Sequence, residues 1–224
     1  MINKIDFSEI LTIVVPGGTS IIAIRYIFPE TINCIKIQDQ LILSFAFIFF
    51  SLIAGHLLNA VKSSTTWKNI FEGENRNPSD HVFDQGLGRT VLSKEYANKI
   101  KDKIVDYKFQ NFKSENINLD VWNAAQQISC LTPSDKLIKL HEQYQFYRVM
   151  NVSIVFIVFV YIIRLIFKFS YLDLLTFNIL TASLFVCFTL FKNMARSRAR
   201  YFVRELLFIT EGHLDAIKKE TKAI

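Results

Sequence analysis

The chain has 224 residues, of which 51% are hydrophobic and 21% charged, with 26 Lys and Arg against 20 Asp and Glu. This apolar fraction excludes an intrinsically disordered chain. The three cysteines, without a CxxC or Cys/His cluster, do not predict a disulfide scaffold or a metal site, and no cofactor is expected. The length alone allows one soluble domain, so the distribution of the charges decides the class of protein.

Four segments of 15 or more residues lack charged residues. Residues 40–61 and 174–191, with 22 and 18 residues, are long enough to cross a hydrocarbon core of about 30 Å. Residues 10–24 and 149–163 reach that length if the arginine that follows each lies near an interface. The alternative is a soluble helical bundle, but a soluble helix needs a polar face, which these segments lack. We therefore predict an all-α fold with membrane helices at 8–28, 40–61, 149–168 and 173–192.

Basic residues indicate the orientation of these helices. Of the 26 Lys and Arg, 13 lie in residues 62–148 and 8 in residues 192–224, whereas the two short connections contain only Lys36. The positive-inside rule then places the N-terminus, the middle segment and the C-terminus in the cytoplasm of a bacterial inner-membrane protein. The expected parts are a first helix pair, a helical cytoplasmic domain, a second helix pair and a C-terminal cytoplasmic helix, at 1–61, 62–148, 149–192 and 193–224.

Helix signals recur in the predicted cytoplasmic parts. Ser93 can cap a helix to about Phe109, with Tyr96, Ile100, Ile104 and Tyr107 on one face. A second short helix is expected with Asp120 as its cap. A third helix starts at Ser134 and shows no break before residue 168, and the fourth span continues to about Lys219. Two long helices are thus expected to connect the cytoplasmic domain to the membrane.

The first span contains Pro16, Gly17 and Gly18 near its middle. Proline removes a backbone hydrogen bond and glycine relaxes a helix, so these residues form either a packing notch for a neighbouring helix or a hinge beside a conduction path. Charged residues near the ends of three helices, Arg25, Arg164 and Asp173, form either a structural charge pairing or an ion-attracting vestibule on the outer side.

His56 and Asn59 lie three residues apart near the inner end of the second span. Residues at this spacing share a helix face. Two interpretations stay open: hydrogen bonds to a neighbouring helix, or a gate.

Basic residues follow the fourth span at a spacing of four. Lys192, Arg196, Arg200 and Arg204 form one stripe, which Arg198 widens and Tyr201 and Phe202 accompany. Such a stripe binds anionic lipid headgroups. It is also suited to a phosphate-bearing ligand, such as a nucleotide or a short oligonucleotide, held by guanidinium groups and aromatic stacking. No catalytic motif is present, so an enzyme is not expected.

These features resemble the small multi-pass membrane proteins of bacterial antiphage defence operons. The resemblance rests on the Pro-Gly-bearing first span, Gly55-His56 closing the second, Tyr147 to Asn151 entering the third, and Arg196 to Arg204 after the fourth. In outline the chain is similar to the channel effectors of Hailong systems, which implies an oligomeric pore controlled by a nucleotide-derived ligand. By span count it also resembles the membrane sensor subunits of Kiwa systems, which implies a soluble DNA-binding partner.

The sequence therefore leads to one hypothesis and one alternative. The hypothesis is a ligand-gated oligomeric channel of antiphage defence, a ring of copies with a tetramer favoured, because four helices in one copy rarely enclose an aqueous path. Its gate would lie near His56 and Asn59. The alternative is a non-conducting membrane sensor or scaffold that recruits a soluble partner protein through residues 62–148.

Overall fold

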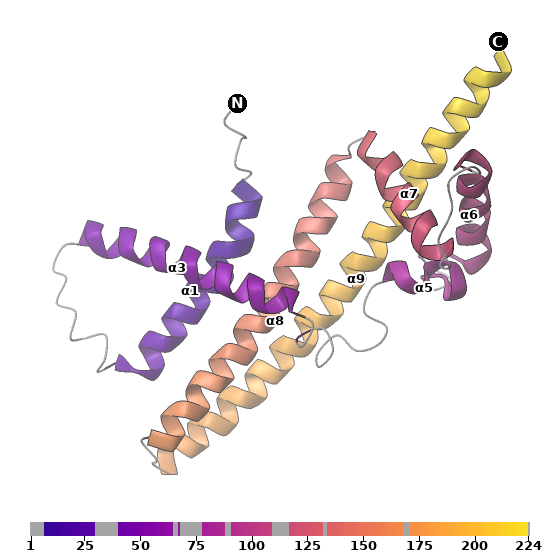
Figure 1. The fold of residues 1–224 in the computed structure, drawn as a ribbon. Coiled ribbons are helices and arrows are strands. Elements are labelled where there is room, and N and C mark those ends of the chain that lie inside the picture. The colour runs from indigo at the N-terminus through magenta and orange to yellow at the C-terminus, as the bar shows by residue number, and fades with distance from the viewer. Residues whose placement is uncertain are drawn as a thin grey trace. The chain divides into compact units, whose positions relative to one another are not determined.

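The computed structural model describes residues 7–29, 40–64, 67, 78–87, 91–108, 117–131, 134–167 and 171–223. Every regular element in these ranges is an α-helix (Figure 1). The helices are α1 (Phe7–Ile27), α3 (Gln40–Ser63), α5 (Pro78–Gln85), α6 (Lys94–Lys108), α7 (Ile117–Leu131), α8 (Asp135–Phe167) and α9 (Tyr171–Ala223).

Four of these helices, α1, α3, α8 and α9, are long and apolar enough to cross a membrane. The all-α fold and the four apolar helices predicted from the charge distribution are confirmed. The last helix, α9, is 53 residues long, or about 80 Å at 1.5 Å per residue. A membrane needs about 20 residues, so most of α9 lies beyond any single crossing, and its charge-free part is residues 174–191.

The chain forms two compact units, residues 1–71 with 142–195 and residues 72–141 with 196–224. We call them the apolar unit and the charged unit. Both α8 and α9 contribute residues to each unit without a break in the helix.

In the apolar unit, α1 and α3 cross (Figure 1), and glycines lie at their closest contact. A Cβ added to Gly17 would lie 1.9 Å from the backbone oxygen of Ser51, and one added to Gly55 would lie 2.1 Å from the backbone oxygen of Ile13. Only glycine permits this approach, since no side chain fits between the two backbones. Ser51 and Gly55 thus form a small-residue contact of the kind that joins membrane helices.

A cluster of hydroxyl groups joins α8 to α1 in the same unit. Ser20 and Ser153 are both buried, with their Oγ atoms 2.8 Å apart, and each Oγ lies within 3.2 Å of the Pro16 carbonyl oxygen. The Thr19 hydroxyl also donates to that oxygen, at 2.8 Å. These contacts satisfy polar groups that an apolar surrounding would otherwise penalise.

Aromatic contacts join α8 to the first part of α9. Tyr161 stacks on Phe177 with ring centroids 5.5 Å apart, and Tyr147 stacks on Phe191 at 6.0 Å. Residue numbers rise from Tyr147 to Tyr161 along α8 while those of their partners fall from Phe191 to Phe177 along α9. The two helices are therefore antiparallel within the apolar unit.

The charged unit has its own hydrophobic core, formed by α5, α6, α7 and the C-terminal part of α9 (Figure 1). Its fully buried side chains include Ile100, Ile104, Val121, Leu206 and Leu207. A buried hydrogen bond of 3.2 Å from Thr210 Oγ1 to the Ala125 carbonyl ties α9 to α7.

Local hydrogen bonds mark two helix ends in the charged unit. The Tyr96 N–H donates to Ser93 Oγ at 3.2 Å, which confirms Ser93 as the cap of α6. Gly86, with φ of 71°, ends α5 by donating to the Val82 carbonyl.

One prediction about these helices is wrong. Asp120 does not cap α7, because the helix already begins at Ile117 and Asp120 lies in its first turn. Tyr107 shares the helix face of Ile100 and Ile104, which are buried, but is itself 50% exposed. It lies in the last turn of α6, and Ala97 occupies the buried face near the other end instead.

Candidate functional site

Arginines and aromatic side chains share one exposed side of α9 in the charged unit. Arg196 and Arg200 are exposed, and Arg204 is half-buried. The Arg204 guanidinium lies over the Tyr201 ring at 5.3 Å and over the Phe208 ring at 5.7 Å. We call Arg196, Arg200, Tyr201, Arg204 and Phe208 the arginine–aromatic surface.

The chemistry of the arginine–aromatic surface suits an anion with a planar group. The Nε atom of Arg204 is buried and has no hydrogen-bond partner among the described residues. Tyr201 and Phe208 are 38% and 39% exposed, so both rings remain partly accessible beside the Arg204 guanidinium. A guanidinium group can donate two parallel hydrogen bonds to a phosphate, and aromatic rings stack on nucleobases.

Two other basic residues of the predicted stripe are arranged differently. Arg198 is half-buried and, two residues from both Arg196 and Arg200, it does not share their helix face. The expectation that Arg198 widens the stripe is therefore not supported by the helix geometry. Lys192 belongs to the apolar unit, where its Nζ lies 5.9 Å from the centroid of the Phe188 ring.

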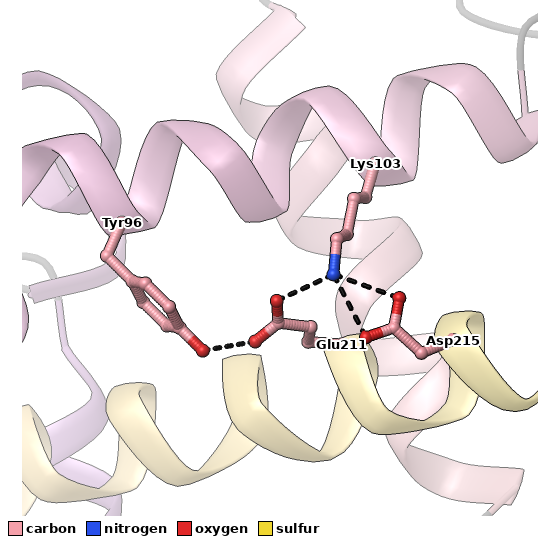
Figure 2. A network of polar contacts seen from close by, with 4 residues as sticks. All are labelled: Tyr96, Lys103, Glu211 and Asp215. Atoms are coloured by element: carbon pink, nitrogen blue, oxygen red, sulfur yellow. Dashed lines mark hydrogen bonds and ion pairs between the residues drawn. The ribbon is translucent and has the colours of Figure 1, made fainter.

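A polar network lies at the edge of this surface, between α6 and α9 (Figure 2). Lys103 Nζ donates to Glu211 Oε1 at 2.7 Å and to the two carboxylate oxygens of Asp215 at 2.9 and 3.0 Å. The Tyr96 hydroxyl donates to the other oxygen of Glu211. The ring of Tyr96 also contacts the ring of Phe208 edge to face, with centroids 5.5 Å apart. The network therefore holds Tyr96 beside Phe208, a member of the arginine–aromatic surface.

The network shifts the ionisation of its members, all of which lie outside the charge-free segments. Burial alone would raise the pKa of Glu211, but the hydrogen bonds from Lys103 and Tyr96 outweigh burial and hold that pKa below its usual value. The hydrogen bond from Lys103 likewise lowers the pKa of Asp215. The same contacts with Glu211 raise the pKa of Lys103 and the pKa of Tyr96. At neutral pH the network therefore holds one cation and two carboxylates.

This network was not predicted from the sequence. Glu211 and Asp215 are four residues apart, so their shared helix face was visible in the sequence. Their partner Lys103 lies 108 residues away from Glu211, and no local pattern connects them.

The predicted gate residues lie at the C-terminal part of α3. His56 is exposed and Asn59 is half-buried, whereas Gly55 and Leu58 face the interior. The buried polar contact at this end comes from Lys62, which is 6% exposed and donates from Nζ to Gln145 Oε1 of α8 at 2.6 Å. A link from α3 to α8 therefore exists one turn beyond the residues that the sequence indicated.

The predicted hinge lies inside α1, and one of the predicted outer charges contacts the end of that helix. Pro16, Gly17 and Gly18 are buried inside an unbroken α1. Arg164 Nη1 donates to the backbone carbonyl of Ile27 at the end of that helix, a favourable place for a cation.

The remaining outer charges make no described pair. Arg25 is exposed, and the side chain of Asp173 lies outside the described residues. The proposed charge pairing of Arg25, Arg164 and Asp173 stays a prediction.

No group of three His, Cys, Asp or Glu side chains comes together as metal ligands within the described ranges. Comparison of the chain with protein families, with curated proteins and with solved structures gives no match. The functional proposal therefore depends on the residues themselves.

Proposed function

We propose that the protein is an oligomeric inner-membrane effector of antiphage defence that conducts ions when a phosphate-bearing ligand binds its cytoplasmic part. The four apolar helices would cross the membrane, and the charged unit would lie in the cytoplasm between and after them. The defence role rests on the resemblance in layout, and the control by a ligand rests on the arginine–aromatic surface of α9.

One observation carries this proposal: the arginine–aromatic surface and the fourth apolar segment belong to one unbroken helix, α9. A ligand on this surface would contact the same helix that continues into the membrane. Such a ligand changes the population of an open state only if it binds that state more tightly than the closed state. The cationic, partly aromatic character of the surface supports a nucleotide or short oligonucleotide as that ligand.

Ion flux from liposomes tests the proposal. The purified full chain is reconstituted in neutral lipid with a trapped fluorescent ion indicator, and nucleoside triphosphates, cyclic dinucleotides and short single-stranded oligonucleotides are added in turn. We expect at least one probe to trigger flux, and Arg200→Gln with Arg204→Gln to abolish it. Arg198→Gln is the matched control, because it removes the same charge from another helix face, and it should conduct normally. Liposomes that stay impermeable to ions with every probe, although the protein is inserted, would contradict the proposal.

The scaffold alternative has one observation in its favour. Leu131 at the end of α7 and Ile138 near the start of α8 are 68% and 47% exposed in the charged unit. Exposed apolar side chains of this size are typical of protein contacts when they lie together. Co-purification of a soluble protein that is lost on Leu131→Ser with Ile138→Ser would favour a recruiting scaffold over a pore.

A further inference from the structure

The charge-free parts of α3 and α9 both expose polar side chains among apolar ones: Gln40, Ser44 and His56 on α3, and Thr176, Asn178, Ser183 and Thr189 on α9. On α3 the exposed large side chains from Leu41 to Ile53 are apolar, and the Ser44 hydroxyl donates to the Gln40 carbonyl. Phe159, Ile162 and Ile166 are the corresponding exposed residues of α8. Lipid tails can cover surfaces of this kind without any loss of hydrogen bonds. The exposed polar side chains of α9 include a carboxamide, that of Asn178, in the charge-free segment.

Asn178 and Thr189 share one side of α9, whereas Thr176 and Ser183 lie on the opposite side, where the Ser183 hydroxyl donates to the Ile179 carbonyl. Asn178, Ala182, Thr189 and Asn193 are all exposed and are separated by four, seven and four residues, which places them on one side of α9. We call this side, which also exposes the ring of Phe185, the α9 polar face. It is distinct from the side toward α8, which is marked by the stacked rings of Phe177 and Phe191.

The two polar side chains on this face within the charge-free segment, Thr189 and Asn178, differ in whether their own helix can satisfy their hydrogen bonds. The Thr189 hydroxyl donates to the Phe185 carbonyl at 2.9 Å, so its own helix satisfies it. The Asn178 carboxamide has two N–H donors and one oxygen acceptor, which is more than a helix turn can satisfy. An exposed carboxamide in hydrocarbon costs several kcal/mol unless another polar group reaches it.

We propose that the α9 polar face is the contact between copies of this chain in the membrane. A carboxamide is self-complementary, because its N–H groups can donate to the oxygen of the same residue in a second copy. Ala182 leaves room for the two helices to approach, as small residues do at membrane helix contacts. This inference rests on the proposed pore, whose subunit contact it names.

Disulfide cross-linking in native membranes tests the contact, in a chain whose three cysteines are replaced by serine. Ala182→Cys places a thiol on the α9 polar face. Ser183→Cys is the matched control, since it is an exposed small residue one position on, about 100° around the helix. We expect mild oxidation to give at least tenfold more cross-linked dimer with Ala182→Cys. Equal or stronger cross-linking with Ser183→Cys would overturn the proposal.

A second measurement follows association directly, by energy transfer between labelled copies in liposomes. Asn178→Leu should weaken association by about threefold or more, the loss expected for one hydrogen bond between membrane helices, and Asn178→Gln should restore it. Unchanged association of Asn178→Leu would overturn the proposal. Cross-linking at residue 182 without any ion flux would refute the pore and keep the contact. Ion flux with cross-linking only at residue 183 would refute the contact and keep the pore.

Discussion

Gly17 of α1 and Gly55 of α3 lie so close that a Cβ on Gly17 would come within 2.7 Å of the Gly55 backbone nitrogen and within 1.9 Å of the Ser51 oxygen. We expect Gly17→Ala and Gly55→Ala each to destabilise the apolar unit by about 1–3 kcal/mol or more, because backbone rather than a flexible side chain must move. Thermal unfolding of the detergent-solubilised chain measures this effect.

Gly212→Ala is the matched control for this prediction. No atom lies within 4 Å of a Cβ added to Gly212, which is in the interior of α9. Alanine there should stabilise the helix by up to about 1 kcal/mol. Stability of Gly17→Ala equal to that of Gly212→Ala would show that the two helices do not cross at these glycines.

The Lys103–Glu211 contact should contribute to the stability of the charged unit. The two side chains are 28% and 13% exposed, so solvent screens their contact only partly. A double-mutant cycle of Lys103→Met and Glu211→Gln should give a coupling free energy of about 1 kcal/mol. Hydrogen–deuterium exchange of α6 amides reports it, and strictly additive effects of the two changes would argue against the contact.

The pH dependence of this unit follows from the same network. The pKa values of Glu211 and Asp215 are lowered by folding, so their contribution is complete above their unfolded values, near 4, and is lost as the pH falls through the folded ones. The pKa values of Lys103 and Tyr96 are raised, so their contribution is complete below about pH 10 and is lost above it.

Exchange rates of the wild type and of Glu211→Gln, measured over a pH series and corrected for intrinsic exchange, should therefore differ by a constant factor from about pH 5 to 9. The difference should shrink below pH 4. A difference that grows on acidification would contradict the network as described.

Lys62 provides a fourth test, since it is buried and donates to Gln145 at 2.6 Å. Gln145→Leu removes an acceptor from a buried ammonium group and should cost about 1–3 kcal/mol, whereas Gln145→Glu keeps an acceptor and should cost less. Thermal unfolding in detergent distinguishes the two variants. Equal losses for both would indicate that packing, and not the hydrogen bond, is what residue 145 supplies.

Much of the fold could be predicted from the sequence because helices leave local signals. The charge-free runs gave the four apolar helices, and Ser93 gave the start of α6. The absence of breakers after Ser134 gave an unbroken α8. Each of these signals depends on residues within a few turns of one another.

The contacts between helices could not be predicted in the same way. Ser20 meets Ser153 across 133 residues, and Lys62 meets Gln145 across 83. A helical period indicates which side of a helix is apolar, but it does not indicate which other helix covers that side. For the same reason the arginine spacing was visible in the sequence, whereas the position of Tyr96 beside Phe208 was not.

The most direct test of the account is the side of the membrane on which the charged unit lies. Gly212→Cys, in a chain without other cysteines, places a single thiol at an exposed and unobstructed position of that unit. A membrane-impermeant thiol reagent should label it in inverted inner-membrane vesicles and leave it unlabelled in intact spheroplasts. Labelling in intact spheroplasts would contradict the cytoplasmic ligand-binding part and the gated pore that depends on it.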